Sequence, residues 1–162
     1  LSRGLGDVYK RQILQYRRVQ DEVESSEKAI PEEQLDREGR LYRQLCELMH
    51  TREVYKDTAL NRDILAEQLG TNSVYLADAV RKYADGATVN EFINGYRLRH
   101  AASLLTNNPD LNINEVEYRS GFNSRATFNR CFRTFFGMSP SEYKAVSKEK
   151  KKTQKDSAEE KA

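Results

Sequence analysis

Residues 121–140 combine a row of aromatic side chains with a cationic and polar face, the two sets that a helix needs to dock and to bind an anionic partner. The row consists of Phe128, Phe132, Phe135 and Phe136. On a helix of about 3.6 residues per turn, steps of four, three and one place all four rings on one stripe. The remaining positions carry arginine, asparagine and threonine, with no acidic residue between Gly121 and Gly137. This pattern is typical of a DNA-recognition helix, and an ordinary amphipathic helix with a solvated face is the alternative.

The same plan occurs a second time, 51 positions earlier in the chain. The matched pairs are Gly70 with Gly121, Asn72-Ser73 with Asn123-Ser124, Gly86 with Gly137, and Glu91-Phe92 with Glu142-Tyr143. In each copy a short helix, a turn at glycine and a second helix follow one another, which is the order of a helix-turn-helix unit. The sequence therefore predicts two such units, at 61–83 and 112–136. A capping box of Thr88 and Glu91 begins a helix that joins them, at 88–106.

Residues 41–143 resemble the DNA-binding domain of the AraC/XylS family of bacterial transcription regulators. The resemblance rests on Asp63-Ile64-Leu65-Ala66 and Gly70, on residues 94–98 and 101–105 of the joining helix, and on Gly121-Phe122-Asn123-Ser124, Phe128, Phe132 and residues 137–143. It implies an all-α fold of about seven helices, with two tandem helix-turn-helix units joined by a long central helix. It also implies a regulator that binds double-stranded promoter DNA in the major groove and contacts RNA polymerase. The resemblance further implies a sensor domain, which we expect to be missing from this chain.

The resemblance assigns DNA contacts to the outward positions of both recognition helices. In the first unit these are Asn72, Ser73, Val74, Ala77, Asp78 and Arg81, and in the second unit Asn123, Arg125, Ala126, Thr127, Asn129, Arg130 and Arg133. We expect Arg130 to contact a base, Arg125 a guanine or a phosphate, and Arg133 a phosphate. Asn129 can pair with adenine, whereas Ala126 and Thr127 can touch a thymine methyl group.

Asp78 departs from the family pattern, in which an arginine is common. A carboxylate that faces phosphates weakens binding unless it accepts from a cytosine amino group or pairs with Arg81 or Lys82. We therefore expect weaker or narrower base reading from the first unit. Arg97, in the joining helix, is expected to be a structural arginine that pairs inside the protein rather than with DNA.

Composition and helix-breaking residues divide the chain into four segments. They are a leader at 1–12 that is non-native or disordered, a charged helical linker at 13–34, the DNA-binding domain at 35–146, and a disordered Lys-rich tail at 147–162. The leader resembles translated sequencing-adaptor read-through, and a native flexible leader is the alternative. The basic pair Arg17-Arg18 suits a linker beside a membrane if a sensor domain precedes it, and a solvated linker is the alternative.

The remaining reactive residues do not form a pattern of catalysis or metal binding. Cys46 and His50 lie four positions apart without further ligands nearby, and His100 is alone. We expect no enzyme, no metal, no cofactor and no small-molecule site. Cys46 and Cys131 lie within helical patterns, which indicates reduced thiols and a cytoplasmic protein, membrane-tethered only through a longer parent chain. A helical protein-interaction adaptor with a degenerate DNA-binding face is the alternative function, favoured by Asp78 and opposed by the arginines of the second unit.

Overall fold

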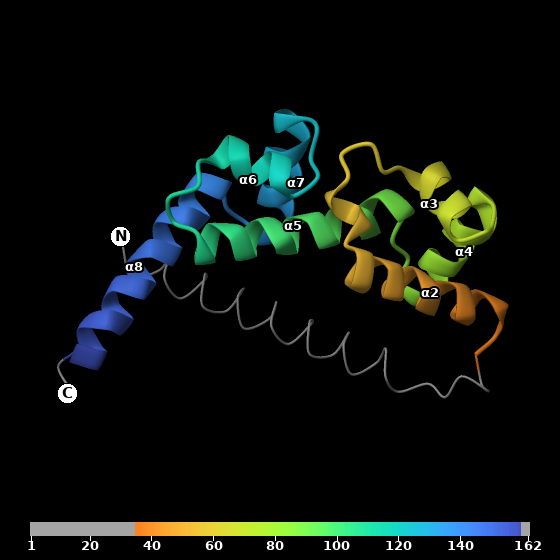
Figure 1. Ribbon diagram of the computed structural model, residues 1–162, viewed down its shortest axis with the longest axis horizontal. Helices are drawn as coiled ribbons and strands as arrows, with labels where there is room; N and C mark the ends of the chain where they lie inside the picture. The colour runs from red at the N-terminus through yellow and green to blue at the C-terminus, as the bar shows by residue number, and fades with distance from the viewer. Residues whose placement is uncertain (1–34, 160–162) are drawn as a thin grey trace.

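The computed structural model describes residues 35–159, which fold into seven α-helices and one short 3-10 helix, without a strand among these residues. In Figure 1 the helix α5 runs through the middle of the molecule, with α2, α3 and α4 at one end and α6, α7 and α8 at the other. The predicted all-α class with two tandem units is confirmed. The expected leader at 1–12 and linker at 13–34 lie outside the described residues.

The first unit has its own hydrophobic core. In the structure this unit consists of the predicted helices α3 (Arg62–Gln68) and α4 (Ser73–Tyr83), together with α2 (Arg37–Arg52) and the 3-10 helix η2 (Val54–Lys56), which pack against them. Leu45, Leu65 and Leu76 are fully buried in its centre. The side chain of Asn61 accepts from the backbone N–H groups of residues 63 and 64, and thus satisfies donors that begin α3 without a partner in the helix.

The central helix α5 (Val89–Asn107) belongs to both cores. The predicted capping box is present, because Thr88 accepts from the backbone of Glu91 and the Glu91 carboxylate accepts from the backbone of Thr88. Ile93 packs in the core of the first unit and Leu105 in that of the second. At about 1.5 Å per residue, its 19 residues make a rod of roughly 28 Å between the two units.

The second unit is built on the phenylalanine row. It consists of α6 (Ile113–Arg119), α7 (Arg125–Phe136) and α8 (Pro140–Glu159). Phe128, Phe132 and Phe136 are buried and form a chain of ring contacts, with centroids 5.6 and 4.6 Å apart. Phe135 was expected on the same buried stripe but is 42% exposed. It lies at the edge of the stripe, where its ring contacts Phe136 from outside the core.

The last helix differs from the prediction at its end. It begins where expected, because Ser139 and Glu142 cap each other: the Ser139 N–H donates to the Glu142 carboxylate at 2.7 Å, and the Ser139 hydroxyl accepts from the Glu142 N–H at 3.2 Å. It does not end near Val146 but continues to Glu159, through residues predicted to form a disordered tail. Residues 147–159 contain no glycine or proline and are rich in lysine, which favours helix.

Candidate DNA-binding surface

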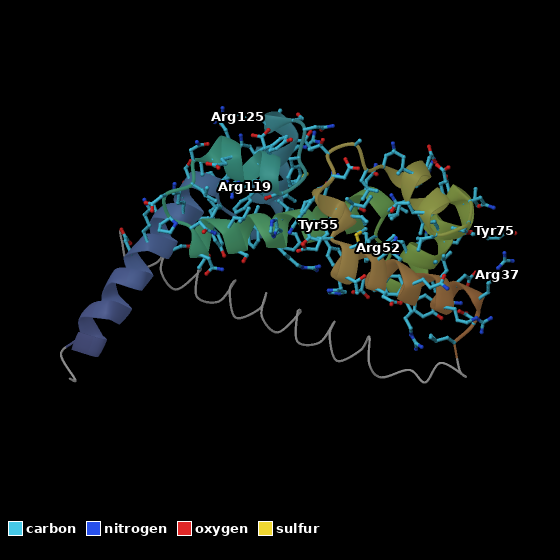
Figure 2. The ribbon with its side chains drawn as sticks, in the orientation of Figure 1. Arg37, Arg52, Tyr55, Tyr75, Arg119 and Arg125 are labelled. Carbon is cyan, nitrogen blue, oxygen red and sulfur yellow. The ribbon has the colours of Figure 1, made fainter. Side chains whose placement is uncertain are left out.

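The helix α7 presents an open cationic face. The exposed side chains among its predicted contacts are Arg125, Ala126, Asn129, Arg130 and Arg133, whereas Thr127 is half-buried. None of the three arginines forms an ion pair with a carboxylate of residues 35–159. In Figure 2 Arg125 lies on the outer edge of the second unit, at the start of α7. These guanidinium groups are therefore available to phosphates and base edges.

Two side chains fix the start of α7, one by capping the helix and one by a hydrogen bond to a distant loop. Ser124 accepts from the backbone N–H of Thr127 at 3.4 Å. The side-chain amide of Asn123, a predicted contact, donates to the backbone carbonyl of Thr58 at 3.4 Å. Asn123 thus links the turn of the second unit to the loop before α3, and this use of its amide was missed at the sequence level because the two residues lie far apart in the chain.

The first turn of α4 uses its predicted contact residues differently. The Asn72 side chain accepts from the backbone N–H groups of Val74 and Tyr75, at 3.0 and 2.9 Å, so it caps the helix. The Ser73 hydroxyl donates to the Asp63 carboxylate, and this hydrogen bond is the main cause of the lowered pKa of Asp63. Val74, the next residue along the helix, is 68% exposed.

Farther along α4 the outward face is mixed. Ala77 is half-buried and packs against the core of the first unit. Asp78 forms an ion pair with Arg81, one of the alternatives that the sequence left open, with 3.1 Å between the Asp78 Oδ1 and the Arg81 Nη1. The carboxylate and the guanidinium therefore offset each other's charge on this face. The arginines of α7 have no such carboxylate partner among the described residues.

Contacts between α2 and α4 were missed by sequence reasoning. Asp36 caps α2 by accepting from the Gly39 N–H at 2.7 Å, and it also accepts from the Tyr83 hydroxyl at 2.8 Å and from the ammonium of Lys82. Glu38 binds the same ammonium at 2.7 Å. The hydrogen bonds from Lys82, Gly39 and Tyr83 lower the pKa of Asp36 to about 2, and the bond from Lys82 has the largest effect.

A second contact of this kind involves Arg37 and Tyr75. The Arg37 guanidinium lies 4.7 Å from the centroid of the Tyr75 ring, and the two side chains are neighbours in Figure 2. The ring remains 45% exposed, which places an aromatic side chain at the start of α4 that the helical pattern did not single out.

Arg97 joins the two units, as predicted for a structural arginine. Its Nε donates to the carbonyl of Tyr55 and its Nη2 to that of Asp57, both at 2.8 Å. The same guanidinium lies 5.8 Å from the centroid of the Phe122 ring in the second unit. The side chain is buried, and this burial lowers its pKa.

Gly121 completes the junction. Its φ of +89° belongs to the left-handed region, and a Cβ on this residue would stand 2.1 Å from the carbonyl oxygen of Tyr55. Figure 2 shows Tyr55 in the middle of the molecule, between the two units. The turn of the second unit therefore approaches η2 so closely that only glycine fits.

The histidines and cysteines have ordinary structural surroundings. The His50 Nε2 lies 3.2 Å from the Tyr96 hydroxyl, and burial is the main cause of the lowered pKa of His100. Cys46 is buried and Cys131 is half-buried, and neither forms a disulfide. Within residues 35–159 there is no group of three or more histidine, cysteine or acidic side chains that could hold a metal ion. None of the helices in this range combines the length and the apolar character needed to span a bilayer.

The comparisons with known proteins agree with this geometry. The sequence model of a family described as "Helix-turn-helix domain" matches residues 65–145. The melibiose operon regulatory protein of Escherichia coli is 28% identical over 97 residues, which are 60% of this chain and 32% of that protein. The chain belongs to the AraC/XylS family. The matched residues 65–145 accordingly belong to a DNA-binding domain of the transcription-regulator class.

Other relatives place this AraC/XylS domain in longer proteins. Histidine kinase P4 of Formosa agariphila is 37% identical over 83 residues, which are half of this chain and 6% of that protein. This chain therefore spans at most about a third of the length of these two relatives. The C-terminal domain of AraT, a response regulator from Geobacillus stearothermophilus, shares the fold with a TM-score of 0.60 at 22% identity, over 68% of this chain and 88% of that one.

Proposed function

We propose that this domain binds double-stranded DNA in a sequence-specific manner, with α4 and α7 in two successive segments of the major groove. The observation that carries the proposal is the exposed face of α7, where Arg125, Arg130 and Arg133 lack a carboxylate partner among residues 35–159. Phosphate contacts by such groups supply affinity, and contacts with base edges supply specificity.

The rigid connection between the units supports simultaneous binding by both recognition helices. Successive major grooves on one face of DNA are about 34 Å apart. The rod of α5, roughly 28 Å long, holds the two units at its ends, and the Arg97 junction fixes their relative orientation. A rigid connection of this length is of the same order as one turn of the double helix, and it supports the proposed spacing of the recognition helices.

The individual contacts follow from the exposed groups. Arg130 and Arg125 suit guanine edges, Asn129 suits adenine, and Arg133 suits a phosphate. Ala126 and Thr127 suit a thymine methyl group. In the first unit, Asn72 caps the helix and Ser73 binds Asp63, so we assign both residues a positioning role. Any contact that they make with DNA uses the amide N–H groups of Asn72 and the hydroxyl lone pairs of Ser73.

The biological setting is part of the proposal. A domain of this class acts on promoters in the cytoplasm and influences RNA polymerase there. Its signal enters through a sensor domain in a longer parent protein, and the similarity to a histidine kinase, which covers 6% of that protein, supports this arrangement. We assign no catalysis, cofactor or small-molecule site to residues 35–159 themselves.

The test is a methylation-protection footprint. The full chain selects duplexes from a random-sequence pool, and dimethyl sulfate then probes guanine N7 atoms in the major groove of the selected duplex. We expect two clusters of protected guanines about one helical turn apart. Arg130→Ala should abolish protection in one cluster and leave the other in place. On a selected duplex that has guanines in both turns, a single cluster in the wild type would contradict binding by two helices. A pool that yields no selected sequence would contradict sequence-specific binding altogether.

An adaptor function remains the second candidate, because the charges on α4 are offset by the Asp78–Arg81 pair and by the partners of Lys82. The salt dependence distinguishes the two functions. Binding through phosphates weakens steeply as salt rises, whereas docking on a protein partner need not.

A further inference from the structure

The two recognition helices differ in the chemistry that they expose. All the cations of α4 have carboxylate partners, since Arg81 pairs with Asp78 and Lys82 pairs with Asp36 and Glu38. The three arginines of α7 have none among residues 35–159. We therefore do not expect the first unit to supply most of the attraction for phosphates.

The first turn of α4 uses one group each of Asn72 and Ser73 for hydrogen bonds within the protein. Asn72 accepts from the N–H groups of Val74 and Tyr75, and the Ser73 hydroxyl donates to Asp63. In helix-turn-helix proteins the N-terminal residues of the recognition helix contact base edges. The most exposed large apolar side chain of this turn is Val74, at 68% exposure against 45% for Tyr75.

Val74 shares its helix face with the Asp78–Arg81 pair. Residues four and seven positions apart lie on one side of a helix, so Val74, Asp78 and Arg81 form a single line along α4. Val74 has no hydrogen-bonding group, and the apolar group in the major groove is the 5-methyl group of a pyrimidine, normally thymine. The carboxylate one turn away would make a neighbouring phosphate unfavourable.

We propose that the first unit reads the 5-methyl group of a pyrimidine, normally thymine, through an apolar contact with Val74. This rests on the proposed DNA-binding function and assigns to that site a residue that sets its specificity. The first unit then contributes sequence selectivity that is nearly independent of salt. The second unit contributes most of the affinity and of its salt dependence.

The test compares thymine with uracil, which differ only by that methyl group. Each thymine of the duplex selected by the full chain is replaced in turn by uracil, and binding is measured for the wild type, Val74→Ala and Val74→Thr. One replacement should weaken the wild type about fourfold, because burying one methyl group contributes roughly the transfer free energy of a CH2 group. The same replacement should change the affinity of Val74→Ala by less than about 1.5-fold. Val74 is exposed, so neither variant should disturb folding.

Matched controls separate this contact from general effects. Uracil replacements in the second half-site should weaken the wild type and Val74→Ala equally. At the position that Val74 contacts, 5-methylcytosine should bind the wild type more tightly than cytosine does, and Val74→Ala should not distinguish the two bases. The fourfold effect should also persist from low to high salt.

The outcomes distinguish this inference from the function on which it rests. If binding is sequence-specific and depends on Arg130, but every uracil effect is the same in Val74→Ala as in the wild type, the assignment to Val74 is wrong and the proposed function stands. If the chain selects no sequence from the pool, the proposed function fails, and the inference fails with it.

Discussion

Replacing Arg97 with methionine should destabilise the domain by about 3 kcal/mol. Methionine fills a similar volume but leaves the carbonyls of Tyr55 and Asp57 without their donor. A hydrogen bond from a charged donor contributes about 1.5–3 kcal/mol, and Arg97 forms two such bonds. Its third hydrogen bond, to the carbonyl of Leu60, is 3.4 Å long and is assigned no contribution. The lower end of the sum applies because the bond to Asp57 is only partly buried.

The assay is urea unfolding of the full chain, followed by far-UV circular dichroism. Arg99→Met is the matched control, since it removes the same charge two positions along α5. The guanidinium of Arg99 lies over the Tyr96 ring at 5.3 Å, so we expect a loss below about 1 kcal/mol. Arg97→Lys should fall between the two, because an ammonium group cannot present the planar fork that reaches both carbonyls. Equal losses in Arg97→Met and Arg99→Met would refute the view that Arg97 joins the units.

Three further predictions concern the junction, the α2–α4 contacts and the cationic face. Gly121→Ala should lower the free energy of unfolding by more than about 3 kcal/mol because its Cβ would overlap the carbonyl of Tyr55, whereas Gly70→Ala, with φ +65° and open space, should lose only about 1–2 kcal/mol; similar losses in urea melts would disprove the close approach. The pKa of Asp36 is about 2 in the folded state against an ordinary 3.8, so its stabilising effect is present above 3.8 and is lost as the pH falls towards 2. The urea midpoint of Asp36→Asn should thus fall less than that of the wild type between pH 5 and pH 2, and parallel curves would count against the Lys82 contact. Arg133→Ala should reduce the slope of log affinity against log salt by about one, and an unchanged slope would mean that no phosphate is bound there.

Helix positions were predictable because their signals are local. Asn61 and the Thr88–Glu91 box mark helix starts within a few residues, and the periodic apolar positions mark the buried faces. The role of Arg97 was predictable only through the family resemblance, since nothing in its neighbours indicates that its partners are carbonyls some 40 positions earlier.

The contacts between distant segments were not predictable from the sequence. Asp36 and Lys82 lie 46 positions apart, and many other acidic and basic residues could have paired equally well. The same holds for Asn123, which the sequence places on the DNA-binding face but whose amide donates to Thr58. The exposure of Phe135 was also not predictable. Helical spacing shows that the four aromatic residues form one stripe, but it does not show which edge of that stripe the core covers.

The measurement that tests the central claim most directly is a salt-resolved DNA-binding titration of the full chain, wild type against Arg130→Ala. The selected duplex is compared with a scrambled duplex of the same composition. We predict tight, salt-sensitive binding to the selected duplex that Arg130→Ala weakens by about 1–3 kcal/mol, with a much smaller effect on the scrambled duplex. Equal weakening on both duplexes would reduce Arg130 to a phosphate contact, and wild-type binding no tighter to the selected duplex than to the scrambled one would contradict a sequence-specific regulator.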